Sequence, residues 1–195
     1  GNLVALQQTN PVRLLAYSSI SQAGFIIAPL AVSGITGNFQ DGIFASVTYL
    51  IIYAFMNIGA FLSVHLFTNF TKSDNFYEWG GIAKHSPLTG VLTTVFFFSL
   101  AGIPPLGGWF AKFVVFRSLL STGEIIGISL AIVGAINAVI ALVYYARISK
   151  VIWMDELKNP EEEKSFEFQS PLKVVGALTV LITFVAGIFP GIFSY

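Results

Sequence analysis

The middle of the chain reads FFFSLAGIPPLGGWFAKF from Phe96 to Phe113, and this stretch decides how the rest of the chain can fold. It carries no charge apart from one lysine, and it contains two adjacent prolines. The Pro104-Pro105 pair supplies no amide hydrogen and clashes with the preceding turn of a helix, which frees the carbonyls of Leu100 and Ala101. The Gly107-Gly108 pair lets the backbone bend further. The stretch therefore predicts an apolar helix that is interrupted in its middle.

Charge-free segments dominate the sequence on both sides of this stretch. Only 10% of the 195 residues are Asp, Glu, Lys or Arg, whereas a soluble domain carries about 25% charged residues to cover its surface. A helix needs about 20 apolar residues to cross the hydrocarbon core of a bilayer. Five segments without these charges reach that length: residues 14–40, 42–71, 85–111, 125–146 and 174–195.

These segments predict an all-α integral membrane protein, because a helix satisfies its own backbone hydrogen bonds within lipid. We expect residues 1–195 to form one transmembrane bundle of about five helices. The helices are expected at about 14–33, 43–70, 87–120, 124–152 and 171–190, and the third of them is expected to break at Pro104-Gly108. A charged, solvated loop is expected at about 154–170.

Composition excludes several classes of function. Ten basic and ten acidic residues cancel, so there is no surplus of positive charge to bind nucleic acid. The sequence has no cysteine, which removes disulfides, thiolate zinc sites and cysteine-held iron–sulfur clusters. His65 and His85 lie far apart without a carboxylate motif, so we expect no metal site and no bound cofactor in this chain. The start, Gly1-Asn2-Leu3, does not resemble a signal peptide, and we interpret the sequence as a piece of a longer chain.

Lysine and arginine are distributed unevenly between the two sides of the expected bundle. In membrane proteins the cytoplasmic loops carry the excess of these residues. We therefore expect the start of the chain and the charged loop on the cytoplasmic side, Tyr195 on the other side, and the bacterial plasma membrane as the default location. Arg117 alone lies opposite to Arg13, Lys72, Lys84, Arg147, Lys150, Lys158, Lys164 and Lys173.

Lys112 is the charged residue inside the broken helix. It lies in the opening turns of the second half-helix, roughly 15 Å of helix from the loop at Thr122, and its stem is too short to cover all of that distance. A lysine near the membrane centre costs roughly 2.5–3.5 kcal/mol on insertion scales, so it indicates a functional site. We predict that Lys112 carries a proton. The alternative is that it pairs with a carboxylate on a segment outside this sequence.

Polar side chains recur at helical spacing beside the broken helix. Tyr49, Tyr53 and Asn57 follow each other at four-residue steps and share one face of the second expected helix. Such groups order water into a proton path, or they join helices by hydrogen bonds worth under about 1 kcal/mol each. Together with Asn137 and Tyr144 of the fourth helix, they are the candidate proton-path residues. Further polar groups are Ser18 and Gln22 on the first helix and Tyr145 on the fourth.

Four runs of sequence carry a resemblance to a known family. The runs are GNLVAL at residues 1–6, RLLAYSSISQAG at 13–24, the stretch from Tyr49 to Phe61, and SLAGIPP with GWFAKF at 99–113. They resemble the antiporter-like membrane-arm subunits of respiratory complex I. The resemblance implies a full subunit of about fourteen spans in two inverted repeats, of which this chain would be the last five. The chain differs at Val12 and Gln22, where many relatives have Lys and His.

The resemblance implies a proton-translocating subunit of NADH:quinone oxidoreductase, in which quinone reduction elsewhere in the complex is coupled to proton transfer through a buried lysine. It maps the family's second-half lysine onto Lys112. It also implies other membrane-arm subunits, lipid and protons as partners, and NADH, flavin, iron–sulfur clusters and quinone on other subunits. Cation/proton antiporters and membrane-bound hydrogenases use similar subunits and stay open as alternatives. So do a secondary transporter with a solute site at the broken helix and a passive helical scaffold.

Overall fold

Helices make up the regular structure of the described residues. The computed structural model describes residues 1–37, 39–156 and 170–188, with side chains except at residues 170–175. The predicted all-α class is confirmed for this part of the chain. The elements are α1 (Asn2–Ala5), α2 (Pro11–Thr36), α3 (Phe39–Thr71), the 3-10 helix η1 (Phe76–Trp79), α4 (Ile82–His85), α5 (Pro87–Ala101), α6 (Gly107–Ser121), α7 (Ile125–Met154) and α8 (Ser170–Ile188).

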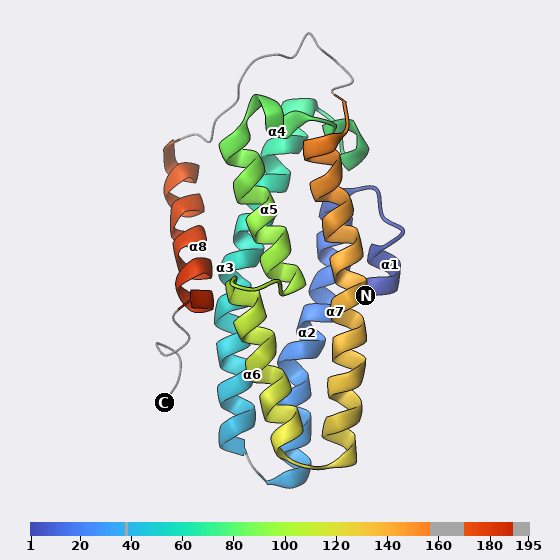
Figure 1. Cartoon of the computed structure of the whole chain (residues 1–195), viewed down its shortest axis with the longest axis vertical. Coiled ribbons are helices and arrows are strands. Elements are labelled where there is room, and N and C mark those ends of the chain that lie inside the picture. The colour runs from blue at the N-terminus through green and yellow to red at the C-terminus, as the bar shows by residue number, and fades with distance from the viewer. Residues whose placement is uncertain (38, 157–169, 189–195) are drawn as a thin grey trace.

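Three long helices, α2, α3 and α7, run along the bundle (Figure 1). Within the described residues, these three are long and apolar enough to cross a membrane. The helices α5 and α6 lie end to end and together match that length, while α8 packs beside α3 and α6 along one half of the bundle (Figure 1). The expected five spans thus appear as three long helices, one stacked pair of half-helices, and α8 with a shorter apolar part, Gly176–Ile188.

Local capping explains why α2 is longer than the expected range 14–33. The Asn10 side chain accepts a hydrogen bond from the backbone N–H of Arg13 at 3.0 Å, and Pro11 fills the first turn, where its missing N–H is not needed. The helix ends at Gly37, whose φ of +77° is a left-handed conformation that glycine adopts without strain. The helix α2 therefore extends beyond the apolar run at both ends, because the residues that start and end a helix need not be apolar.

The break in the third span lies at residues 102–106 rather than at Pro104-Gly108. Gly102 has a φ of +94° and ends α5 before the prolines are reached, because a left-handed glycine stops a helix at little cost. The Pro104-Pro105 pair fills the connection. The Gly107-Gly108 pair forms the first turn of α6 and does not form the bend, so the prediction was wrong about the role of these two glycines.

Glycines at the break permit close contact between three helices. A Cβ atom on Gly108 would overlap the carbonyl oxygen of Ser99 in α5, and one on Gly107 would lie 2.9 Å from the carbonyl oxygen of Thr183 in α8. On the other side of this contact, a Cβ atom on Gly187 would overlap the carbonyl oxygen of Pro105. The ends of α5, α6 and α8 therefore meet backbone to backbone, as small residues allow in membrane helices.

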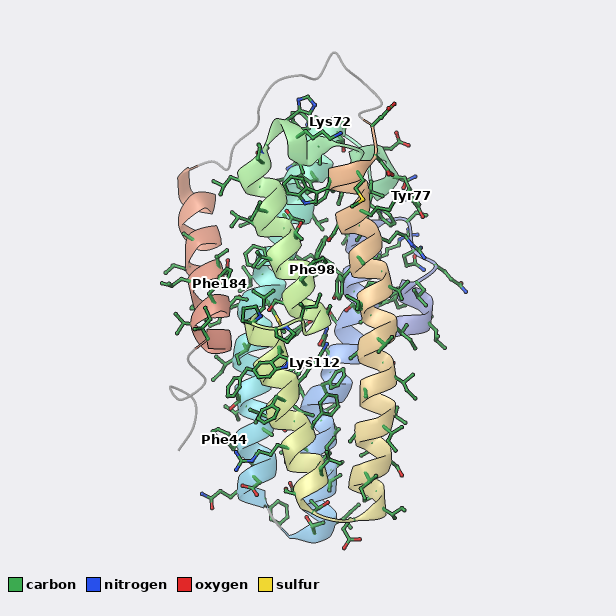
Figure 2. The ribbon with its side chains drawn as sticks, viewed as in Figure 1. Phe44, Lys72, Tyr77, Phe98, Lys112 and Phe184 are labelled. Carbon is green, nitrogen blue, oxygen red and sulfur yellow. The ribbon has the colours of Figure 1, made fainter. Side chains whose placement is uncertain are left out.

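One end of the bundle carries Lys72, Lys84 and Lys150, and we call it the charged end. The connection between α3 and α5, residues 72–86, lies there and contains η1 and α4, next to the last turns of α7 (Figures 1 and 2). Most of the predicted loop at 154–170 lies outside the described residues, as does Tyr195. The assignment of the charged end to the cytoplasmic side stays a prediction.

The contact between α8 and the break can be tested with one added methyl group. We expect Gly187→Ala to lower the free energy of unfolding by about 1–3 kcal/mol, the usual cost of overpacking a tight contact. The matched control is Gly176→Ala in the same helix, where an added Cβ meets nothing within 4 Å. Thermal unfolding in reconstituted membranes measures both variants. Equal midpoints would contradict the seating of α8 against the connection.

Candidate functional site around Lys112

Lys112 lies in α6 just after the break, and only 4% of its surface is exposed. Its ammonium group donates hydrogen bonds to the carbonyl oxygens of Leu100, at 2.9 Å, and Ala101, at 2.6 Å. These carbonyls belong to the last turn of α5, where no further helix residues supply amide donors. They are the two carbonyls that the sequence predicts to be freed by the prolines. The lysine of one half-helix therefore caps the end of the other (Figure 2).

Helix dipoles favour a cation at this position. The carboxyl-terminal end of α5 carries a partial negative charge, and the Lys112 ammonium lies against it. From the sequence, the positive end of the second half-helix is the nearer dipole. In the structure, that end lies at Gly107, more than a turn before Lys112, and the side chain points to α5 instead. The direction of the side chain, which sequence spacing does not give, decides which dipole acts on the ammonium.

Aromatic rings complete the surroundings of the ammonium group. The Lys112 Nζ atom lies 5.3 Å from the ring centroid of Phe25 on α2, within the range of a cation–π interaction. The Phe25 ring stacks on Tyr49 of α3, with centroids 5.7 Å apart, and meets Phe116 edge-on at 6.1 Å. Among the described residues, no carboxylate forms an ion pair with Lys112. Carbonyl dipoles and an aromatic face therefore stabilise this cation in place of a counter-ion.

Gln22 joins Lys112 to α3 by hydrogen bonds. Its side-chain amide donates to the carbonyl oxygen of Leu100 at 3.3 Å, so this oxygen accepts from both Gln22 and Lys112. The hydroxyl of Tyr49 donates to the side-chain oxygen of Gln22. Tyr49 is one of the predicted proton-path residues, whereas Gln22 was noted on the first helix but was not among them. We call Lys112, Gln22 and Tyr49, with the Leu100 carbonyl, the lysine network.

A second network joins α1, α2 and α7. The hydroxyl of Tyr144 donates to Asn2 Oδ1 at 3.0 Å and lies 3.0 Å from Ser18 Oγ, which in turn lies 2.6 Å from the hydroxyl of Tyr145. The side-chain amide of Asn2 donates to the backbone oxygen of Asn137 at 2.7 Å. Ser18 lies one turn from Gln22 on α2, so this tyrosine network adjoins the lysine network. Asn2 was missed as a site residue, because a polar residue in a short helix has no period to reveal it.

The side chains of Tyr49, Tyr53 and Asn57, which follow one another at four-residue steps along α3, lie in different surroundings. Tyr53 donates to Ser19 Oγ at 2.8 Å and is half-buried, so it contacts α2 beside the lysine network. Asn57 is also half-buried and makes no side-chain hydrogen bond to any residue that the structure describes. Each four-residue step exceeds one full turn of the helix by about 40°. Tyr53 and Asn57 are therefore turned progressively away from Lys112.

The break itself is held by short-range hydrogen bonds. Ser99 Oγ accepts from the backbone N–H of Gly108 at 3.1 Å, which satisfies one of the unpaired donors at the start of α6. The backbone N–H of Leu106 donates to the oxygen of Ile103 at 3.1 Å across the two prolines. The stem of Lys112 passes over Gly102, where a Cβ atom would lie 2.8 Å from Lys112 Cδ. The connection and the lysine thus form one packed unit.

A discontinuous helix with a charged group at its break is typical of membrane proteins that move ions or solutes. The comparison with protein families is more specific. The family described as NADH:quinone oxidoreductase/Mrp antiporter, TM, matches residues 1–140. The chain belongs to this family, and the predicted resemblance is confirmed.

NADH-quinone oxidoreductase subunit N of Moorella thermoacetica is 38% identical to this chain over 190 residues. The match covers 97% of this chain but 38% of the relative, so the chain spans less than two fifths of the length of this curated relative. Within the family, the run from Asn57 to Phe61 also resembles subunit N. NAD(P)H-quinone oxidoreductase subunit 2 of Gloeothece citriformis is also 38% identical, over 196 residues that cover 96% of this chain and 37% of that relative.

Solved structures share the fold. A chain of the membrane-bound sulfane sulfur reductase, an archaeal respiratory membrane complex, matches with a TM-score of 0.82 and 28% identity, covering 97% of this chain and 30% of that chain. A chain of respiratory complex I from Thermus thermophilus with bound NADH matches with a TM-score of 0.79 and 19% identity, covering 99% of this chain and 38% of that one. The second likeness concerns the fold alone.

The packing of Lys112 over Gly102 makes a prediction about stability. Gly102 and Gly123 both have positive φ, +94° and +68°, so alanine costs about 1–2 kcal/mol at either position through backbone strain alone. Only at Gly102 does the added methyl also displace Lys112. We expect Gly102→Ala to lower the free energy of unfolding by about 1–3 kcal/mol more than Gly123→Ala. Denaturant unfolding in detergent micelles compares the two, and equal losses would contradict the contact.

Proposed function

We propose that this chain is part of a proton-translocating membrane subunit of an NADH:quinone oxidoreductase, and that Lys112 carries the proton. The observation that supports the proposal best is the position of the Lys112 ammonium, buried at a helix break and held by the carbonyls of Leu100 and Ala101. A buried lysine in a membrane span is costly, and its presence at a break points to a role in ion movement.

Lys112 is arranged to respond to distant charge. The carbonyl groups around it accept hydrogen bonds from the ammonium and cannot themselves take up the proton. No carboxylate of the described residues pairs with it, so a charge that approaches from another segment of the subunit, or from a neighbouring subunit, changes the balance between the charged and neutral amine. In a low-dielectric interior such charges act over longer distances than in water. Lys112 would take up a proton when the charged amine is favoured and would release it when the neutral amine is favoured.

Hydroxyl groups near Lys112 belong to two networks and would carry the proton together with water. Tyr49 belongs to the lysine network, and Tyr144 with Asn137 belongs to the tyrosine network one turn away. Gln22 has no titratable proton and serves as a hydrogen-bonding link. Tyr53 and Asn57 stay candidates for the path, although their contacts give them less support than Tyr49 and Tyr144.

The rest of the proposed activity lies outside this chain. The names of the family and of the Moorella relative support a complex that uses NADH and quinone. The resemblance implies that NADH, flavin, iron–sulfur clusters and quinone would bind to other subunits of that complex. The partners would be neighbouring membrane-arm subunits and the lipid bilayer. We further propose a bacterial plasma membrane as the location, with the charged end on the cytoplasmic side, on the basis of the distribution of lysine and arginine.

A cation/proton antiporter is the second candidate function, because the family description includes Mrp antiporters. The same lysine would then exchange protons against a gradient of metal cations, without electron transfer. The two functions differ in what drives the proton. Dependence of proton movement on NADH and quinone favours the oxidoreductase, and dependence on a sodium gradient favours the antiporter.

Replacing Lys112 tests the proposal directly. In proteoliposomes that contain the intact complex, we expect Lys112→Ala to slow proton translocation by about a hundredfold, the contribution of a positioned proton-transfer group. Lys112→Arg keeps the charge but cannot release a proton, so we expect it to be about as defective. Proton translocation and electron transfer are measured together in each preparation.

The control for this experiment is Lys150→Ala, which removes an exposed lysine at the charged end. It should translocate protons at the wild-type rate. If assembled Lys112→Ala and Lys112→Arg complexes also did so, Lys112 would be a structural capping residue and the passive scaffold would be the better interpretation.

Tyr49 provides a separate test of the lysine network. Tyr49→Phe removes the hydroxyl that donates to Gln22 and keeps the ring that stacks on Phe25. Because one hydrogen bond is worth about 0.5–1.5 kcal/mol, we expect proton translocation to slow by about twofold to tenfold. Tyr77→Phe, at an exposed tyrosine of η1, is the matched control. Identical rates for both variants would remove Tyr49 from the proton path.

A further inference from the structure

Arg117 is the one lysine or arginine of the described part of the chain that lies near the end of the bundle opposite the charged end. Its side chain is exposed in the last turns of α6, and it forms no hydrogen bond or ion pair with any described residue. The rule that gathers basic residues on the cytoplasmic side gives no reason for an arginine at this end. The lysine network does not use Arg117 either, so its position needs a separate explanation.

A pocket of about 370 Å³ lies beside Arg117, between the last turns of α6 and the first turns of α3. Ligand sites in proteins have volumes of about 300–1,000 Å³, so the pocket is large enough for a small ligand group. Two opposite charges line it, the guanidinium of Arg117 and the carboxylate of Asp41. The remaining wall is partly polar and partly apolar, and it is formed by Gln40, Ser118 and Ser121 and by Phe44 and Val114.

The depth of the pocket in the membrane follows from the break between α5 and α6. These half-helices have 15 residues each, so the break lies near the middle of the span that they form. Arg117 comes ten residues after Gly107, about 15 Å further along α6. This is half of a hydrocarbon core of about 30 Å. The guanidinium of Arg117 therefore lies where the hydrocarbon core ends and the lipid headgroups begin.

Asp41 lies at the same depth on α3. The two helices pack side by side and run in opposite directions (Figure 1). A Cβ atom on Gly107 would lie 3.1 Å from Ile52 Cγ2, which aligns these two residues. Asp41 comes eleven residues before Ile52, about 16 Å along α3. The two charges are therefore level with each other at the edge of the membrane, and Phe44 lies between this level and Lys112 (Figure 2).

A zwitterionic phospholipid with a primary amine complements this arrangement. A guanidinium donates two parallel hydrogen bonds to a phosphate group. A carboxylate accepts hydrogen bonds from a primary ammonium, whereas a quaternary ammonium has no N–H to donate. Phe44 and Val114 line the pocket on the side of the hydrocarbon core, where they would contact the first carbons of the acyl chains.

We propose that this pocket binds the headgroup of phosphatidylethanolamine, with the phosphate at Arg117 and the ammonium at Asp41. Gln40 and Ser118 would donate further hydrogen bonds to the phosphate oxygens. A phosphatidylglycerol headgroup lacks the cation that Asp41 would bind, and a phosphatidylcholine headgroup lacks the N–H donors. The site lies apart from the lysine network, so the inference goes beyond the proposed proton transfer and does not depend on it.

A photocrosslinker at the pocket tests the proposal in the intact complex. p-Benzoylphenylalanine replaces Phe44, whose side chain is 37% exposed. The complex is reconstituted in vesicles that contain equal amounts of phosphatidylethanolamine, phosphatidylglycerol and phosphatidylcholine with the same acyl chains. After irradiation, mass spectrometry identifies the lipid attached to the peptide that contains residue 44. We expect phosphatidylethanolamine to be attached about twofold to fivefold more than either other lipid, the effect of one exposed charge pair.

The matched control carries the same photocrosslinker in place of Ile125. This residue is exposed at the start of α7, at the same end of the bundle, and does not line the pocket. It should attach the three lipids in equal amounts. A preference of the same size at residue 125 would mean that the lipid surface, and not the pocket, selects phosphatidylethanolamine, and would overturn the proposal.

Two substitutions separate the contributions of the two charges. With the photocrosslinker at residue 44, we expect Asp41→Asn to attach phosphatidylethanolamine and phosphatidylcholine equally, because the partner of the ammonium is lost. We expect Arg117→Gln to lower the attachment of all three lipids by about twofold to fivefold, because each has a phosphate. Glu124→Gln removes an exposed acid at the same end of the bundle and should leave the lipid preference unchanged.

A structural measurement on the unmodified complex gives a readout that does not depend on any substitution. A cryo-electron microscopy map in nanodiscs of the same lipids should contain headgroup density against Arg117, with acyl chains that pass Phe44. A helix of a neighbouring subunit in the pocket would overturn the proposal. So would equal attachment of the three lipids at residue 44, or a preference there for phosphatidylglycerol.

Discussion

The hydrogen bonds from Lys112 to the carbonyls of Leu100 and Ala101 are the interaction on which the rest of the structure depends. Unpaired carbonyls at a helix end and an ammonium without a counter-ion are each costly away from water. Brought together, they satisfy one another. The break at Gly102 makes the carbonyls available, and α6 brings the cation back to them. The break and the lysine are therefore two parts of one arrangement.

The long helix α2 connects this arrangement to the remaining polar groups. It contributes Ser18 to the tyrosine network, Gln22 to the lysine network and Phe25 to the face of the ammonium. These residues follow one another at intervals of three or four along one side of the helix, which explains why they converge on Lys112. The opposite side of α2 carries exposed apolar residues such as Ile20 and Ile27, as expected for a surface toward lipid or another subunit.

Sequence reasoning predicted the features that depend on local chemistry. Proline chemistry predicted the break and the freed carbonyls. The cost of a charge in a membrane marked Lys112 as a candidate site residue, and its role stays a prediction. It did not predict that Gly102 would end α5 before the prolines, because two helix-ending signals compete within three residues. It also left out Gln22 and Asn2, whose partners lie on other helices and are defined only by tertiary packing. Burial of Phe76 and Trp79 explains why η1 forms in the connection between α3 and α5.

The connection between α5 and α6 has a consequence for how related sequences can diverge. The ammonium of Lys112 reaches a carbonyl eleven residues earlier in the chain. Because each helical residue adds about 100° of rotation and 1.5 Å of rise, a single insertion or deletion in this interval would turn the lysine away from both carbonyls. Substitutions can accumulate there, but the number of residues cannot change. Functional homologues should therefore align from the end of α5 to the lysine without gaps, even where few side chains are shared.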